Sequence, residues 1–241
     1  MADRTIGTIL GEYLSKINYE DLPPDVVELA KTRILNALAV SIPGRDMPAS
    51  VVAWKSVKDN KGACTIIGRS EKVPPADAAL VNGVMSHTLF HEDTGLGGHP
   101  CTMVIPAALA IGEEVGATGQ QVITAIVAGY ETFGRVSRGM TQHLSRRGFR
   151  MGPLIGPIGA AATAAKLLRL NAQETTHALG FAANLGAGLY QANAEGTMEL
   201  PHQAGNAARG GVTAALVAKN GGVAASRVFE GDRGLYRLFT G

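Results

Sequence analysis

Apolar side chains recur every three or four positions along most of this chain, and that spacing restricts the fold to packed helices. Helices are predicted over residues 5–17, 24–43, 49–57, 76–91, 104–115, 120–136, 156–168 and 204–219, with another beginning after the N-cap residue Asn171. One apolar run, residues 64–68, predicts a short strand or an extended connector. Because strands and helices do not alternate, the pattern predicts one all-α domain over residues 1–241.

Small side chains constrain how these helices pack. Glycine supplies 31 of the 241 residues, nearly twice its usual share of about 7%. The glycines follow no collagen-like period, so the excess indicates helices whose backbones approach closely. The segment 156–168, rich in Ala, Gly and Leu, is therefore predicted to be a central buried helix.

Charge and cysteine content exclude several classes of protein. The formal net charge is only +2, which gives little support to a nucleic-acid partner. The chain contains no apolar run of the roughly 18 residues that a membrane span needs, and its first residues do not resemble a secretory signal. Two cysteines are too few for a disulfide framework, so we expect a cytoplasmic protein without membrane or nucleic-acid partners.

The densest group of polar residues lies in residues 86–100, which hold three of the six histidines and a Gly-rich loop. If the predicted helix continues that far, His87 and His91 share one face. This spacing suits a metal site whose third ligand comes from Glu92, Asp93 or His99. It equally suits general acid/base chemistry, in which a carboxylate holds an imidazole, or merely a capped helix end followed by a solvated loop.

Two further groups carry candidate ligand-binding residues. Arg150 follows several surface arginines and directly precedes the predicted buried helix, where a guanidinium is well placed for an anionic ligand. Glu199 and His202 stand just before another helix rich in small residues, where they either cap a turn or contact a ligand. The chain has no serine nucleophile elbow, no CxxC pair and no P-loop.

Several motifs, in order along the chain, resemble those of the MmgE/PrpD family. That family includes 2-methylcitrate dehydratases, cis-aconitate decarboxylases and an iminodisuccinate epimerase. The matching residues are 35–39, Asn82-Gly83, Ser86-His87, His99-Pro100 with 104–110, 129–131 with Arg135, 165–168, His202, Gly205, 207–208 and Glu230-Gly231. The resemblance extends over nearly the whole chain.

The resemblance implies a helical domain that forms homodimers and a smaller α/β lid domain later in the chain, with the site between them. It implies small di- or tricarboxylate substrates, proton transfer next to a carboxylate, and neither metal nor other cofactor. Carried over to this sequence, it assigns catalytic roles to Asp93, His99 and His202. It assigns substrate-binding roles to His91, Thr94, Arg150 and Glu199.

Four positions within these motifs depart from the family pattern. The acidic loop has Phe90 in place of its first Asp and His91 in place of its aromatic residue. Arg150 replaces a His, and Glu199 replaces a Lys, which reverses a charge and weakens the binding of any carboxylate placed there. We therefore expect a substrate other than 2-methylcitrate.

The chain also ends about where the family's lid would begin. We expect either a fragment or a subunit that is active only with a second polypeptide carrying the lid.

Three functional hypotheses follow. The first is a lyase, dehydratase-like, or an isomerase that acts on a small carboxylic acid, as a homodimer or as a hetero-oligomer with a lid-containing subunit. The second is a non-catalytic partner subunit or scaffold of a split enzyme. The third is a metal-dependent hydrolase built on His87, His91 and Asp93.

Overall fold

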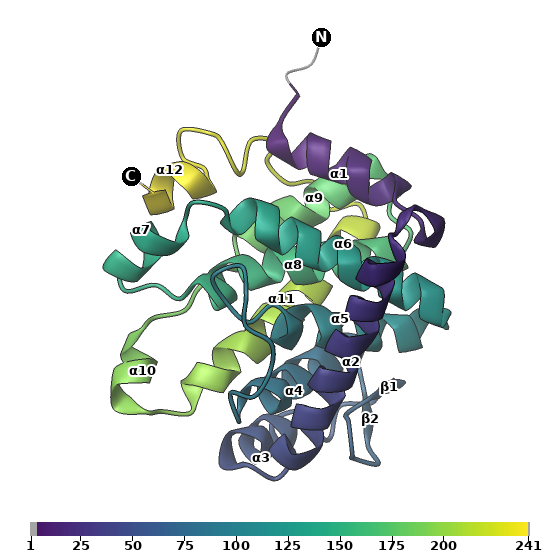
Figure 1. The fold of residues 1–241 in the computed structure, drawn as a ribbon, viewed down its shortest axis with the longest axis vertical. Helices are drawn as coiled ribbons and strands as arrows, with labels where there is room; N and C mark the ends of the chain where they lie inside the picture. The colour runs from purple at the N-terminus through teal and green to yellow at the C-terminus, as the bar shows by residue number, and fades with distance from the viewer. Residues whose placement is uncertain (1–3, 241) are drawn as a thin grey trace.

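A computed structural model describes residues 4–240 and confirms the all-α prediction. Figure 1 shows helices throughout the described chain, joined by loops of which those over residues 88–100 and 220–234 are long, and one small two-stranded ribbon. The elements are α1 (Ile6–Lys16), η1 (Tyr19–Asp21), α2 (Pro24–Gly44), α3 (Pro48–Lys55), β1 (Cys64–Thr65), β2 (Lys72–Val73), α4 (Pro75–His87), α5 (Cys101–Val115), α6 (Gly119–Ser137), α7 (Thr141–Arg146), α8 (Met151–Leu167), α9 (Ala172–Ala183), α10 (Gln191–Glu195), α11 (Glu199–Lys219) and α12 (Leu235–Thr240). None of these helices is long and apolar enough to cross a bilayer.

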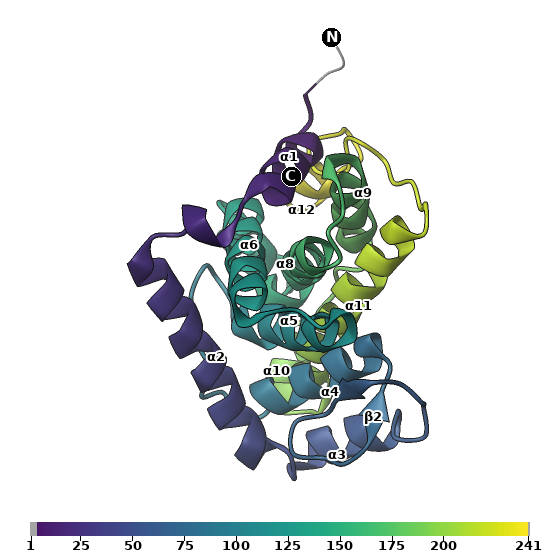
Figure 2. The same ribbon diagram turned by 90° about the vertical axis from the view of Figure 1, so that its right-hand side faces the viewer.

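Helix α8 forms the centre of the molecule, with α5, α6, α9 and α11 arranged around it (Figure 2). All of its residues are buried except Gly152 and Lys166, which confirms the predicted central helix. The neighbouring helices approach through their glycines. A Cβ atom on Gly129 of α6 would lie only 2.0 Å from Thr163 Oγ1 of α8, and one on Gly211 of α11 would lie 2.4 Å from Ala160 Cβ. The glycine excess therefore allows the close packing of this core.

The central helix α8 and its neighbour α11 begin several residues earlier than the apolar pattern predicts. Helix α8 begins at Met151 rather than at residue 156, and α11 begins at Glu199 rather than at residue 204. Both contain a proline in the first turn, Pro153 and Pro201, where the missing N–H would have no partner within the helix. A proline in these segments is thus compatible with a helix.

The predicted helix over residues 76–91 is too long. Helix α4 ends at His87, and Phe90 adopts the left-handed conformation with φ 55°, which a continuing helix excludes. His87 and His91 therefore do not share a helical face. The predicted strand is shorter than residues 64–68, because Gly68, with φ 72°, turns the chain after Cys64–Thr65 toward its antiparallel partner β2.

Residues 88–100 form a loop that folds back on itself between α4 and α5. Gly95 and Gly98 exchange backbone hydrogen bonds of 3.0 and 2.9 Å across a turn in which Gly97 has φ 82°. The Asp93 carboxylate accepts a 3.2 Å bond from the backbone N–H of Cys101, the first residue of α5. This bond ties the loop to the helix that follows and starts α5 earlier than residue 104.

Candidate functional site

A cavity of about 300 Å³ lies where the 88–100 loop meets α8, α10 and α11. The loop ends near the first turns of α8 and α11 in Figure 1, so residues distant in the sequence share this cavity. Its polar lining includes His87 at the end of α4, His99 at the end of the loop, and Arg150 directly before α8. Two of the three predicted groups of polar residues therefore meet at one site, and the third contributes the start of α11.

Glu92 joins the two histidines. Its Oε1 atom lies 2.5 Å from His87 Nδ1 and 3.1 Å from His99 Nδ1, and its side chain is fully buried. Burial alone raises the pKa of Glu92, but the hydrogen bonds from His87 and His99 outweigh it and lower that pKa to about 2. Glu92 is therefore a buried carboxylate that stays ionised throughout the neutral range.

His87 has a defined protonation state. Its Nε2 atom lies 3.0 Å from Arg150 Nη2, and a guanidinium can only donate, so Nε2 must be the acceptor. The proton of the neutral ring then resides on Nδ1 and is donated to Glu92. Burial is the main cause that lowers the pKa of His87, and the nearby Arg150 charge lowers it further. His87 is thus a neutral ring linking the guanidinium to the carboxylate.

His99 is the more accessible of the two rings. Its Nδ1 atom faces two acceptors, Glu92 Oε1 and, at 3.2 Å, the carbonyl oxygen of Asp93. Nδ1 therefore carries the proton of the neutral ring, and Nε2 is left with a free lone pair. The hydrogen bond to Glu92 raises the pKa of His99 against the opposing effect of burial. A histidine held in this way is suited to take up and return a proton.

Arg150 is buried and held from several sides. Its Nη1 group donates to Leu200 O at 3.0 Å and to Gln203 Oε1 at 2.8 Å, both in α11. Its backbone N–H donates to Gly188 O at 2.9 Å. Burial lowers the pKa of the guanidinium, but an arginine remains charged in proteins. The site therefore contains a fixed positive charge next to His87.

Asp93 and Thr94 lie on the other side of the loop. The Asp93 carboxylate accepts a 2.8 Å hydrogen bond from Tyr130 OH and lies 3.4 Å from Arg33 Nε. Both residues line a second cavity of about 290 Å³ between α2 and α6. Only the backbone carbonyl of Asp93 reaches His99, so the structure separates the predicted catalytic pair Asp93 and His99.

The remaining predicted residues do not line the His99 cavity. His91 is exposed, and its Nδ1 lies 2.6 Å from Leu89 O. Glu199 is exposed in the first turn of α11, and His202, one turn further on, is half-buried, which lowers its pKa. Their predicted catalytic and binding roles stay predictions.

The structure does not assemble the metal site postulated from His87, His91 and Asp93. The side chains that do come together are His87, Glu92 and His99, whose potential ligand atoms lie within 4.8 Å of one another. However, a metal on His87 Nδ1 would displace the proton from that nitrogen while Arg150 occupies Nε2. The ring would then have to be an anion, so these residues fit a hydrogen-bonded network better than a metal centre.

Three residues of these sites have roles that the sequence analysis did not assign. The sequence pattern offers Glu92 only as one of three alternative metal ligands, and it does not indicate Arg33 and Tyr130 as partners of Asp93. The one available signal that Glu92 contacts His87 and His99 was its closeness to both histidines along the sequence.

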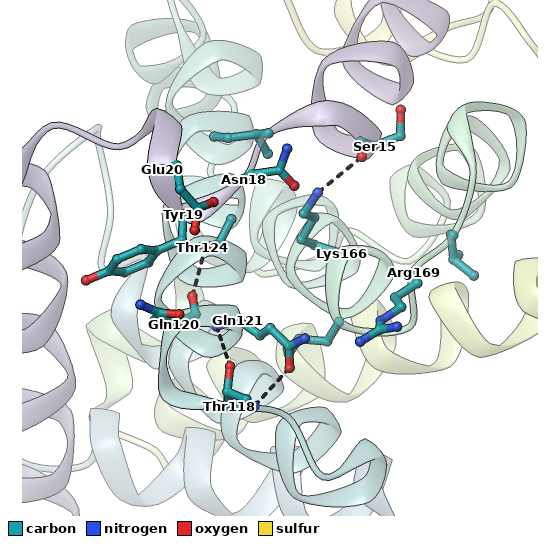
Figure 3. A pocket seen from close by; sticks show the side chains of 13 residues that line it. Ser15, Asn18, Tyr19, Glu20, Thr118, Gln120, Gln121, Thr124, Lys166 and Arg169 are labelled. Carbon is teal, nitrogen blue, oxygen red and sulfur yellow. Dashed lines mark hydrogen bonds between the residues drawn. The ribbon is translucent and has the colours of Figure 1, made fainter.

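Figure 3 shows a larger pocket, of about 600 Å³, at the ends of α1 and α8 and the start of α6. Its polar groups serve these helix ends. Lys166 Nζ donates to Ser15 O at 3.2 Å, and Thr118 and Gln121 exchange the hydrogen bonds of a capping box. None of the predicted site residues lines it, so the smaller cavity around His99 is the candidate functional site.

Comparisons with known proteins agree with the resemblance to the MmgE/PrpD family. A model of the MmgE/PrpD N-terminal domain matches residues 8–241. The chain is 31% identical over 239 residues to the cis-aconitate decarboxylase-like protein oryM of Aspergillus oryzae, covering 93% of this chain and 49% of that protein. It is 33% identical over 243 residues to a cis-aconitate decarboxylase of Aspergillus terreus (95% and 49% covered), and 30% identical over 206 residues to the human cis-aconitate decarboxylase (81% and 42%).

The chain thus spans about half the length of the curated relatives it matches. The family model covers nearly all of the chain, and the helical fold agrees with it. We conclude that this chain belongs to the MmgE/PrpD family, whose N-terminal domain it matches.

Proposed function

We propose that this chain carries the acid/base site of a lyase that acts on a small carboxylic acid. The observation that carries the proposal is the state of His99: Nδ1 is held by Glu92, and Nε2 is left for a ligand in a cavity that Arg150 also lines. The relatives support the class of reaction, since their names describe them as cis-aconitate decarboxylases.

The geometry suggests a division of labour. The Arg150 guanidinium binds a substrate carboxylate and lies next to His87, whose neutral ring separates it from Glu92. His99 Nε2 exchanges a proton with the carbon next to that carboxylate. When the ring accepts the proton, the ionised Glu92 stabilises the imidazolium that forms, at a distance of 3.1 Å from Nδ1. The same proton transfer would serve an isomerase. A lyase and an isomerase therefore differ only in the step that follows this proton transfer.

Solvent deuterium exchange tests the proposal without requiring a complete reaction. The protein is incubated in D₂O with a panel of small hydroxy acids and unsaturated acids, and loss of the C–H signal next to the carboxylate is followed by NMR. We expect exchange, and we expect His99→Asn to slow it by about 100-fold or more, the usual contribution of a general base.

His143→Asn is the matched control, because His143 is an exposed histidine of α7 that does not line the cavity and has no predicted role. It should leave the exchange rate unchanged. Exchange that is equally fast in the His99 variant would refute the proposal. Absence of exchange with every acid of the panel would favour the non-catalytic subunit instead.

A further inference from the structure

The larger pocket of Figure 3 contains two cations from the end of α8. Lys166 and Arg169 both line this cavity of about 600 Å³, and neither forms an ion pair within residues 4–240. Figure 3 shows them on one side of the pocket, whereas Glu20, the one carboxylate among its described lining residues, lies on the other side. A ligand in this pocket therefore meets two positive charges that have no counter-charge in the described chain.

Lys166 is half-buried and has unused donors. Its ammonium group has three N–H bonds, and one of them donates to Ser15 O at 3.2 Å, in the last turn of α1. Burial lowers the pKa of Lys166, and the nearby Asp21 charge opposes this effect only in part. Within the described chain, two N–H groups are left for a ligand, and an anion bound to them would offset the cost of burying the charge.

Arg169 occupies a backbone position that glycine usually takes. Its φ of 55° is left-handed, and it directly follows Leu168, the C-cap residue of α8. The turn is closed by a 3.0 Å bond from Leu170 N–H to Ala165 O, the pattern of a Schellman helix end. A side chain at this position costs free energy that glycine avoids. Strain of this kind is typical of positions that hold a ligand, and here it accompanies an exposed guanidinium that lines the pocket.

The form of these donors favours a phosphate group over a carboxylate. The amide oxygen of Gln121 accepts from Thr118 N–H at 2.9 Å, which leaves its NH₂ group as a neutral donor in the same pocket. A phosphate monoester has three terminal oxygens and nearly two negative charges on one group. It can therefore accept from Lys166, Arg169 and Gln121 together, whereas a planar carboxylate has two oxygens and one charge.

We propose that this pocket binds a small phosphate monoester. The phosphate group lies between Lys166 and Arg169, and the rest of the molecule contacts the polar side chains at the start of α6. The pocket is at the opposite end of α8 from Arg150, and the 17 residues of that helix separate the two by about 25 Å. This second site is therefore separate from the proposed acid/base site and does not depend on it.

Glycerol 3-phosphate, glycerol and succinate are the three probes. They separate the effect of the phosphate group from that of the polyol and from that of two carboxylates. Each is titrated into the 241-residue chain at about pH 7.5 and one fixed ionic strength, where the monoester carries nearly two charges. The NMR signal of the Gln121 side-chain amide reports binding in this pocket. We expect glycerol 3-phosphate to bind saturably and at least about tenfold more tightly than succinate, and glycerol not to bind.

Two variants locate the binding. Arg169→Gly removes the guanidinium and suits the left-handed backbone, so it keeps the fold, and Lys166→Gln removes the ammonium group. Each should weaken binding of glycerol 3-phosphate by about tenfold or more. Arg146→Gln is the matched control, because Arg146 is an exposed arginine of α7 that does not line the pocket. It should leave the dissociation constant unchanged.

The proposal is overturned if glycerol 3-phosphate gives no saturable shift, or if succinate binds as tightly. It is also overturned if Arg169→Gly binds the monoester as well as the unmodified chain does. Equal weakening by Arg146→Gln would overturn it too, because binding would then depend on net charge rather than on this pocket. Since Arg169→Gly is compatible with the helix end, the test does not depend on whether the half-buried Lys166 tolerates replacement.

Discussion

Replacing Glu92 by Gln removes the charge that joins His87 and His99 while keeping the size of the side chain. The folded chain lowers the pKa of Glu92 from its ordinary 4.5 to about 2, which corresponds to about 3 kcal/mol of stabilisation. Since a carboxylate with a lowered pKa stabilises the fold only while ionised, this contribution is complete above about pH 5 and is lost as the pH falls toward 2.

We therefore expect Glu92→Gln to reduce the free energy of unfolding by about 3 kcal/mol at pH 7. The difference from the unmodified protein should shrink as the pH falls from 5 to 2, because the unmodified protein loses this stabilisation over that range. The variant should also lower the pKa of His99, since the hydrogen bond to Glu92 is the main cause that raises it. Because both imidazoles lie against the same oxygen of Glu92, an amide oxygen in its place can still accept from them, so the variant removes the charge and leaves the acceptor.

Urea unfolding at several pH values gives the stability difference, and NMR titration of the His99 ring proton gives its pKa. Glu131→Gln is the control, because Glu131 pairs with Arg135 at the surface of α6 and such pairs contribute about 1 kcal/mol or less. Equal stability of the Glu92 variant and the unmodified protein at pH 7, with an unchanged His99 pKa, would refute the reasoning.

Three further predictions concern the surroundings of the site. Tyr130→Phe removes the hydroxyl that donates to the buried Asp93 carboxylate, so urea unfolding should show a loss of about 1–3 kcal/mol; no loss would mean that the bond is not formed. Gly129→Ala places a methyl group against Thr163 in the core and should lower the midpoint of thermal unfolding by several degrees, whereas an unchanged midpoint would contradict the close packing of α6 on α8. Leu35 and Ile42, seven residues apart on one face of α2, are 67% and 58% exposed, and we propose that this face mediates self-association, so Leu35→Glu should reduce the sedimentation coefficient; an unchanged coefficient would argue against that face.

The architecture could be predicted from the sequence because it depends on local patterns. Helical spacing of apolar residues and the excess of small side chains were sufficient for the all-α fold and for the central helix α8. Helix ends were less predictable, because Pro153 and Pro201 are compatible with a first helical turn and Phe90 adopts a left-handed conformation despite its side chain.

The candidate site was predictable in composition but not in arrangement. The sequence indicated His99 and Arg150, and the structure places both at one cavity. The sequence could not indicate which way the Asp93 side chain points. The backbone N–H at the start of α5 and the Tyr130 hydroxyl together direct that carboxylate into the second cavity, between α2 and α6. The central position of Glu92 likewise depends on where α4 ends, so only the folded chain shows it.

The central claim is that Glu92, joined at His99 by the carbonyl oxygen of Asp93, holds the proton on Nδ1 of both histidines and leaves His99 Nε2 as the base. Long-range ¹⁵N–¹H NMR of the imidazole rings, recorded above the His99 pKa, measures this directly. We expect both His87 and His99 to be protonated on Nδ1, and we expect Glu92→Gln to lower the pKa of His99 while the carbonyl oxygen of Asp93 keeps the proton on its Nδ1. Protonation of His99 on Nε2 in the unmodified protein would contradict it.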